Sequence, residues 1–110
     1  MSGSELESYV ERKFGRWMIE EFGIKNPVSE NPDVLSVKTT RRGFPDRTFW
    51  LPDRQVEIIE FKREGEEPTA LQARHIEWLR QMGHVVHVVA GIEEARELFY
   101  EIRTNKRRRG

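Results

Sequence analysis

The segment Val56–Lys62, with the sequence VEIIEFK, constrains the fold more than any other part of the chain. Side chains of a strand point alternately to its two faces, so one face ends in Glu60 and Lys62 and the other carries Ile59 and Phe61. A strand that is apolar on both faces is typical of the centre of a sheet covered by helices on both sides. An unpaired charge in such a place is costly. The segment therefore predicts a partner, a cation or a water-filled cleft at Glu60 and Lys62, unless the strand end is frayed and solvated.

Apolar periodicity and turn residues predict the other elements. Helices are expected at about 4–22, 69–82 and 93–102, and strands at 34–40, 47–51 and 84–90. The second helix is expected to bury one stripe: Leu71, His75, Trp78, Leu79 and Met82. A chain of 110 residues has room for one core. The predicted fold class is α/β, a small mixed sheet flanked by helices in the order αβββαβ, with an extra C-terminal helix.

The net charge of zero hides an asymmetry between the body of the chain and its end. Residues 1–101 hold all 19 acidic residues and 14 of the 19 Lys and Arg, and the last nine residues hold the remaining five basic ones. We therefore expect a domain at 1–102 and a basic tail at 103–110, which is either solvated or in contact with a polyanion. There is no cysteine, which excludes disulfides and thiolate zinc sites. The sequence has no apolar stretch of about 20 residues and no signal-peptide pattern, so a cytoplasmic location is expected.

A second carboxylate precedes the central strand. Asp46 follows Gly43-Phe44-Pro45 and stands fourteen residues before Glu60, at the start of the neighbouring predicted strand. A hairpin of that length brings two carboxylates side by side, where they repel each other unless a divalent cation coordinates both. The alternative interpretation of Pro45-Asp46 is an ordinary turn.

These residues resemble a known family. Pro45-Asp46 followed by Glu60-Phe61-Lys62 is similar to the signature of the PD-(D/E)XK nuclease superfamily. The wider pattern resembles the VRR-NUC (virus-type replication-repair nuclease) family over about residues 5–91. It comprises Gly43–Asp46, Ile59–Arg63, Leu71-Gln72 opening a helix that contains Trp78-Leu79, and Gly83 before a Val-rich strand.

The resemblance implies a divalent-metal site. It implies that Asp46 and Glu60 bind Mg²⁺ or Mn²⁺ with help from the main-chain carbonyl of Phe61. It implies that Lys62 orients or activates the attacking water, or stabilises developing charge, and that Gln72 points from its helix into the site.

The resemblance also implies a glutamate from the first helix, which joins the catalytic set and is a further ligand of the metal. Glu7 is the preferred candidate because the inward apolar stripe continues from it, while Glu5 and Glu11 remain open. Both assisting residues have a structural alternative, since Ser4 to Glu7 and Thr69 to Gln72 fit the capping-box pattern. In that case the side chains of Glu7 and Gln72 cap the first turns of their helices.

The function implied is metal-dependent, structure-specific DNA endonuclease activity. Stand-alone members of the family resemble viral proteins that process branched DNA, including four-way (Holliday) junctions, during DNA repair. Arg41, Arg42, Arg47 and Arg63 flank the expected site and are candidates for phosphate contacts. Symmetric junction cleavage needs two active sites, which implies a homodimer. The alternatives are a flap- or nick-processing nuclease, or a non-catalytic nucleic-acid-binding protein that retains the fold.

Overall fold

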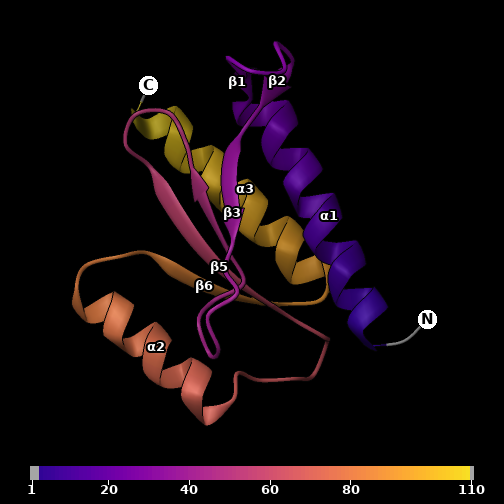
Figure 1. Ribbon diagram of the computed structural model, residues 1–110, viewed down its shortest axis with the longest axis vertical. Helices are drawn as coiled ribbons and strands as arrows, with labels where there is room; N and C mark the ends of the chain where they lie inside the picture. Colours follow the sequence, from indigo (N-terminus) through magenta and orange to yellow (C-terminus); the bar gives the residue numbers. More distant parts are fainter. Residues whose placement is uncertain (1–2, 110) are drawn as a thin grey trace.

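A four-stranded sheet forms the centre of the molecule, in the order β3-β4-β5-β6 (Figure 1). The strands are β3 (Leu35–Lys38), β4 (Arg47–Trp50), β5 (Val56–Lys62) and β6 (Val86–Ala90). The structure is a computed structural model that describes the backbone of residues 3–109 and the side chains of residues 6–105. β4 pairs antiparallel with β3 and β5, and β6 pairs parallel with β5. The predicted inner position of β5 is therefore confirmed.

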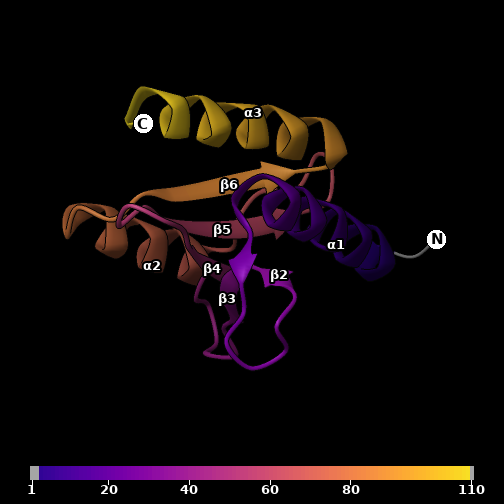
Figure 2. The same cartoon turned by 90° about the horizontal axis from the view of Figure 1, so that it is seen from above.

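Helices cover both faces of the sheet. α1 (Gly3–Phe22) and α3 (Ile92–Arg109) lie on one side and α2 (Ala70–Gln81) on the other, which Figure 2 shows from above. On the first side, Ile59 and Phe61 are buried in the larger core with residues of α1 and α3. On the second side, Ile58 packs with Ile76 of α2. The predicted α/β class, a mixed sheet flanked by helices, is confirmed.

The alternation of side chains along β5 explains the arrangement. Residues 57–61 are all buried, so both faces of this strand are covered. Burying one Ile or Phe side chain completely contributes about 1.5–3 kcal/mol. A layer of helix on each side is therefore the arrangement that stabilises this sequence best.

Two segments differ from the sequence-based expectations. A two-stranded ribbon, β1 (Ile24–Lys25) with β2 (Pro32–Asp33), occupies the stretch expected to be a loop. Strands of two residues are too short to show the alternation of apolar and polar residues by which a strand is predicted from sequence. α3 also continues past residue 102, where a separate tail was expected to begin, up to Arg109. The expectation followed the apolar pattern, whereas Lys and Arg favour helix without one. The side chains of the basic residues 106–109 lie outside those described.

The buried stripe of α2 is also different from the predicted one. Ile76 and Leu79 are buried, whereas Trp78 and Met82 are each 55% exposed. Trp78 is turned by about 100° from Leu79 around the helix axis, so it lies beside the stripe. Its indole contacts the ring of His75 at the helix surface. None of the helices in the described part of the chain is long and apolar enough to cross a bilayer.

Candidate active site

The loop before β4 fixes the position of Asp46. Gly43 has φ of +78°, and a Cβ at this position would collide with the side chain of Leu71 on α2. Glycine is therefore required both for the turn and for the close contact. Pro45 is buried, and the carbonyl of Asp46 accepts a hydrogen bond of 2.8 Å from the backbone N–H of Thr39. The loop is thus attached to α2 on one side and to the sheet on the other.

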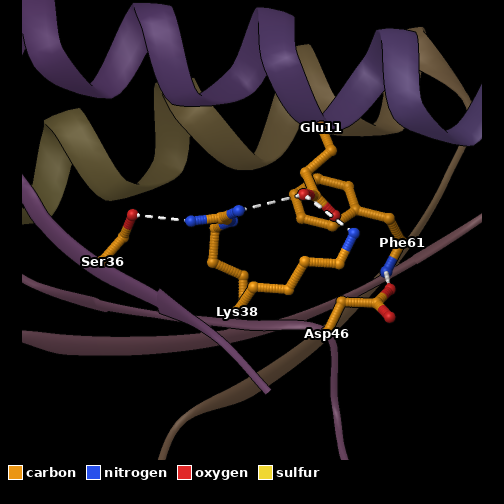
Figure 3. A network of polar contacts seen from close by, with 6 residues as sticks. Glu11, Ser36, Lys38, Asp46 and Phe61 are labelled. Atoms are coloured by element: carbon orange, nitrogen blue, oxygen red, sulfur yellow. Dashed lines mark hydrogen bonds and ion pairs between the residues drawn. The ribbon is translucent and has the colours of Figure 1, made fainter. Parts of the chain in front are cut away.

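The carboxylate of Asp46 lies against the end of β5. Its Oδ2 atom accepts a hydrogen bond of 2.8 Å from the backbone N–H of Phe61 (Figure 3). The β4–β5 register pairs Arg47 with Ile59, which places Asp46 next to Glu60. The hairpin therefore brings the two carboxyl groups together, as the spacing predicted.

Glu60 is a buried carboxyl group in an unfavourable environment for a charge. Its side chain is 1% exposed, and its Oε2 atom has no hydrogen-bond partner among the described residues. Burial, a hydrogen bond with the Asp46 carboxyl group and the charge of Asp46 raise the pKa of Glu60 to about 9. Without a cation, Glu60 is therefore protonated at neutral pH.

Two further charged residues lie near this pair. The positive charge of Lys62 lowers the pKa of Glu60, and the negative charge of Glu7 raises it further. Glu7 comes from α1, which begins at Gly3, so the backbone of Ser4 lies within the helix and not at its N-cap position. Asp46, Glu60, Lys62 and Glu7 therefore converge from three separate segments of the chain.

The donor set fits a hard divalent cation. Carboxylate oxygens are the ligands that Mg²⁺ and Mn²⁺ prefer, and a cation beside Glu60 would provide its unpartnered oxygen with a charge partner. The described residues form no group of three or more His, Cys, Asp or Glu side chains arranged to hold a metal ion. Among the described side chains, Asp46 and Glu60 are therefore the candidate metal ligands, without the third carboxylate that Glu7 was expected to add, and water is available for other positions.

Glu11 does not join the carboxyl pair. Its Oε2 atom lies 3.3 Å from Nη2 of Arg47 and 3.8 Å from Nζ of Lys38 (Figure 3). Arg47 also donates a hydrogen bond of 2.9 Å to the hydroxyl of Ser36. Glu11 is thus paired with two basic side chains. The side chain of Glu5 lies outside those described. Of the three first-helix glutamates, the structure brings Glu7 toward the site.

Gln72 closes a capping box at the start of α2. Its side-chain oxygen accepts a hydrogen bond of 2.8 Å from the backbone N–H of Thr69, and the Thr69 hydroxyl accepts one of 3.2 Å from the N–H of Gln72. The structure therefore shows the capping alternative for Gln72 in place of an orientation into the carboxyl pair. The two side chains thus each satisfy the backbone N–H of the other residue, which is a sufficient reason for glutamine here.

The four arginines that were expected to contact DNA phosphates fall into two groups. Arg41 and Arg42 are exposed at the turn that leads to Asp46. Arg47 is held by Glu11 and Ser36, and Arg63 forms an ion pair with Glu66. Of these four, Arg41 and Arg42 are the ones whose guanidinium groups have no hydrogen bond or ion pair among the described residues.

Sequence reasoning missed a second buried carboxylate. Glu57 is 3% exposed and accepts hydrogen bonds from Gln55 Nε2 at 3.0 Å and from His87 Nε2 at 2.8 Å. Glu57 lies on the opposite face of β5 from Glu60, so it belongs to the core and not to the carboxyl pair. The signal was present in the sequence, since an acidic residue occurs on a face otherwise formed by Ile59 and Phe61.

Replacing His87 should therefore lower stability without changing the candidate site. We expect His87→Ala to reduce the free energy of unfolding by about 1–3 kcal/mol, because Glu57 loses a buried hydrogen-bond partner. Urea unfolding followed by circular dichroism measures the loss. His84→Ala is the matched control, because His84 is exposed just before β6. Equal stability of the two variants would contradict the prediction.

Comparisons with known proteins agree with the fold. No family model matches the chain. A solved structure described as a VRR_NUC domain superposes with a TM-score of 0.67 at 26% identity, covering 86% of this chain and 94% of its own. A second, described as a VRR_NUC domain protein, shares the fold with a TM-score of 0.61 at 19% identity, covering 86% of this chain and 84% of its own.

A phage protein gives the sequence match. It is named "Putative nuclease p44", from Acyrthosiphon pisum secondary endosymbiont phage 1, and is 42% identical over 53 residues, or 48% of this chain. The match spans 57% of that relative's length.

Proposed function

Because the chain has a VRR-NUC domain, we propose that it is a divalent-metal-dependent deoxyribonuclease that hydrolyses phosphodiester bonds. The observation that supports this most is the pairing of Asp46 with Glu60, a carboxyl group that is buried and has an unpartnered oxygen. A fold built only for stability has no need of two acids at this place, since burying a charge without a partner is costly.

Each residue of the site has a role in this proposal. Asp46 and Glu60 would hold Mg²⁺ or Mn²⁺, with the main-chain carbonyl of Phe61 as a further ligand. Such an ion polarises the scissile phosphate and lowers the pKa of a bound water. The ammonium group of Lys62 orients the attacking water by hydrogen bonding and offsets the negative charge that develops on the phosphate. Glu7 supplies a further acceptor for that water from α1.

The proposed substrate is branched DNA, with four-way junctions as the first candidate. The match to a phage protein named as a nuclease supports a viral context. Symmetric cleavage of a junction requires two sites, and one chain of 110 residues has one, so we include a homodimer in the proposal. The expected cytoplasmic location, in a host cell if the protein is viral, is also kept as a proposal.

Cleavage of a panel of end-labelled DNAs tests the proposal. The panel contains a four-way junction, a flap, a linear duplex and a single strand, each incubated with EDTA, Mg²⁺ or Mn²⁺. We expect cuts that require the metal, that are lost in Asp46→Ala, and that lie symmetrically on the junction. Cuts confined to the flap would reject junction resolution but retain the nuclease.

Two results would contradict larger parts of the proposal. Binding of all four DNAs without metal-dependent cleavage would indicate a non-catalytic nucleic-acid-binding protein. A monomer in light scattering at the concentration at which junctions are cut would reject the homodimer.

A further inference from the structure

A groove runs along α1 on the side that faces the edge strand β3. Its volume is about 580 Å³, and residues of α1, the β2–β3 segment and β4 line it. Arg12 and Arg16 of α1 stand on its rim, and both also line a second hollow of about 200 Å³ together with Tyr9 and Lys13. The two arginines therefore form a basic ridge between two hollows.

Neither arginine has a role in holding the fold together. Both side chains are exposed, and neither forms a hydrogen bond or ion pair with any residue that the structure describes. Their spacing of four residues places them one above the other on the same face of the helix. Two free guanidinium groups in such a row match successive phosphates of a nucleic-acid strand.

The acidic residues of the groove do not cancel this charge. Glu11 is paired with Arg47 and Lys38. Asp33 accepts hydrogen bonds from Asn26 and from the backbone of Val34. Glu20 is the one other acid in the lining, at the end of α1 far from Glu7. The part of the groove nearest the carboxyl pair is therefore basic.

Gly15 is a second, independent observation. It lies in the middle of α1 and lines the groove, and a Cβ added to it would meet no atom within 4 Å. Glycine in a helix interior reduces stability relative to alanine. Packing within this chain gives no reason for it. A glycine on the floor of a groove allows the backbone of a ligand to approach closely.

The groove leads to the candidate active site. Glu7, Glu11 and Gly15 follow each other at intervals of four residues on α1 (Figure 3 shows Glu11 on this helix). Each interval is a rise of about 6 Å, so Glu11 and Gly15 lie about 6 Å and 12 Å along the helix axis from Glu7. Arg47, the residue that follows Asp46, also lines the groove, so one end of the groove lies beside the carboxyl pair.

We propose that this groove, with Arg12 and Arg16 on its rim and Gly15 on its floor, binds the phosphodiester backbone of DNA next to the bond that is cut. The inference rests on the proposed nuclease function, because that function places the bond that is cut at the end of α1 that carries Glu7. It assigns DNA contact to α1, whereas the sequence pattern placed it at Arg41, Arg42, Arg47 and Arg63.

Binding measured without cleavage tests the groove separately from the chemistry. The probe is a fluorescein-labelled four-way junction, titrated in EDTA with Arg12→Ala, Arg16→Ala and the double variant. We expect the double variant to bind at least about tenfold more weakly, since two charge-assisted hydrogen bonds to phosphate are absent. The slope of log K against log salt should fall by about two, one for each phosphate that is no longer neutralised. Arg74→Ala is the control, because Arg74 is exposed on α2, away from the groove.

Gly15 gives a test that leaves the charge unchanged. We expect Gly15→Ala to raise the melting temperature by about 4 °C, because alanine favours helix and nothing lies in its way. Gly15→Leu should stay folded and bind the junction about tenfold more weakly, because its side chain fills the groove. Affinity and salt slope equal to wild type in both the double variant and Gly15→Leu would overturn the inference, even if the protein cleaves DNA. Loss of binding in these variants of a protein that never cleaves would support the groove and reject the nuclease.

Discussion

Glu60→Gln should abolish metal-dependent hydrolysis and at the same time make the metal-free protein more stable. The glutamine amide keeps the size of the side chain and is neutral at every pH, so folding does not require it to take up a proton. Burial and the neighbouring Asp46 raise the pKa of Glu60 to about 9, which measures how strongly the fold disfavours the charged form. An effect of opposite sign on activity and on stability is typical of a residue kept for function.

The pH dependence of stability follows from the same pKa. The folded protein holds the proton of Glu60 up to about pH 9, whereas the unfolded chain releases it near the ordinary value of 4.5. The contribution of this group to stability is therefore complete below pH 4.5 and is lost as the pH rises toward 9. The slope is at most about 1.4 kcal/mol per pH unit. The stability of Glu60→Gln should change less with pH than that of the wild type over this interval.

Urea unfolding at several pH values in EDTA measures both effects. Glu64→Gln is the matched control, because Glu64 is exposed just after β5 and should leave the pH profile unchanged. Adding Mg²⁺ or Mn²⁺ should stabilise the wild type and not Glu60→Gln, because a ligand that binds only the folded state stabilises it. A wild-type stability that does not fall between pH 5 and 9 would contradict the buried-acid interpretation of Glu60.

The parts of the fold that were predictable are those in which burial repeats along the sequence. Both faces of β5 are apolar, so its central position and the helices on each side followed from seven residues. The pairing of Asp46 with Glu60 followed from the length of a hairpin. In each case one local pattern determined the answer.

The remaining features depend on contacts between distant segments. The sequence allows Gln72 both to cap a helix and to enter the site, and the hydrogen bonds with Thr69 decide between them. Likewise, the apolar stripe of the first helix favours Glu7 but leaves Glu11 open, and the contacts of Glu11 with Lys38 and Arg47 exclude it. No periodicity along the chain reports such choices.

Lys62→Met should reduce the rate of cleavage by about 10² to 10⁴-fold, the usual contribution of a positioned proton-handling group. Methionine keeps most of the apolar stem of lysine and removes the ammonium group. Binding of the junction, measured in EDTA, should change far less than the rate, since Lys62 acts on the reacting water and phosphate. Lys25→Met is the matched control, because Lys25 is exposed in the β1–β2 ribbon.

The pH–rate profile separates an electrostatic role of Lys62 from a structural one. The charge of Lys62 lowers the pKa of Glu60, so its removal makes the carboxyl pair harder to deprotonate. Metal binding requires the deprotonated pair, and the residual activity of Lys62→Met should therefore move to higher pH. A variant that merely packed badly would lose activity at every pH alike, with a lower melting temperature. Full activity of Lys62→Met, with an unshifted profile, would remove Lys62 from the site and leave the two carboxylates as its only assigned chemical groups.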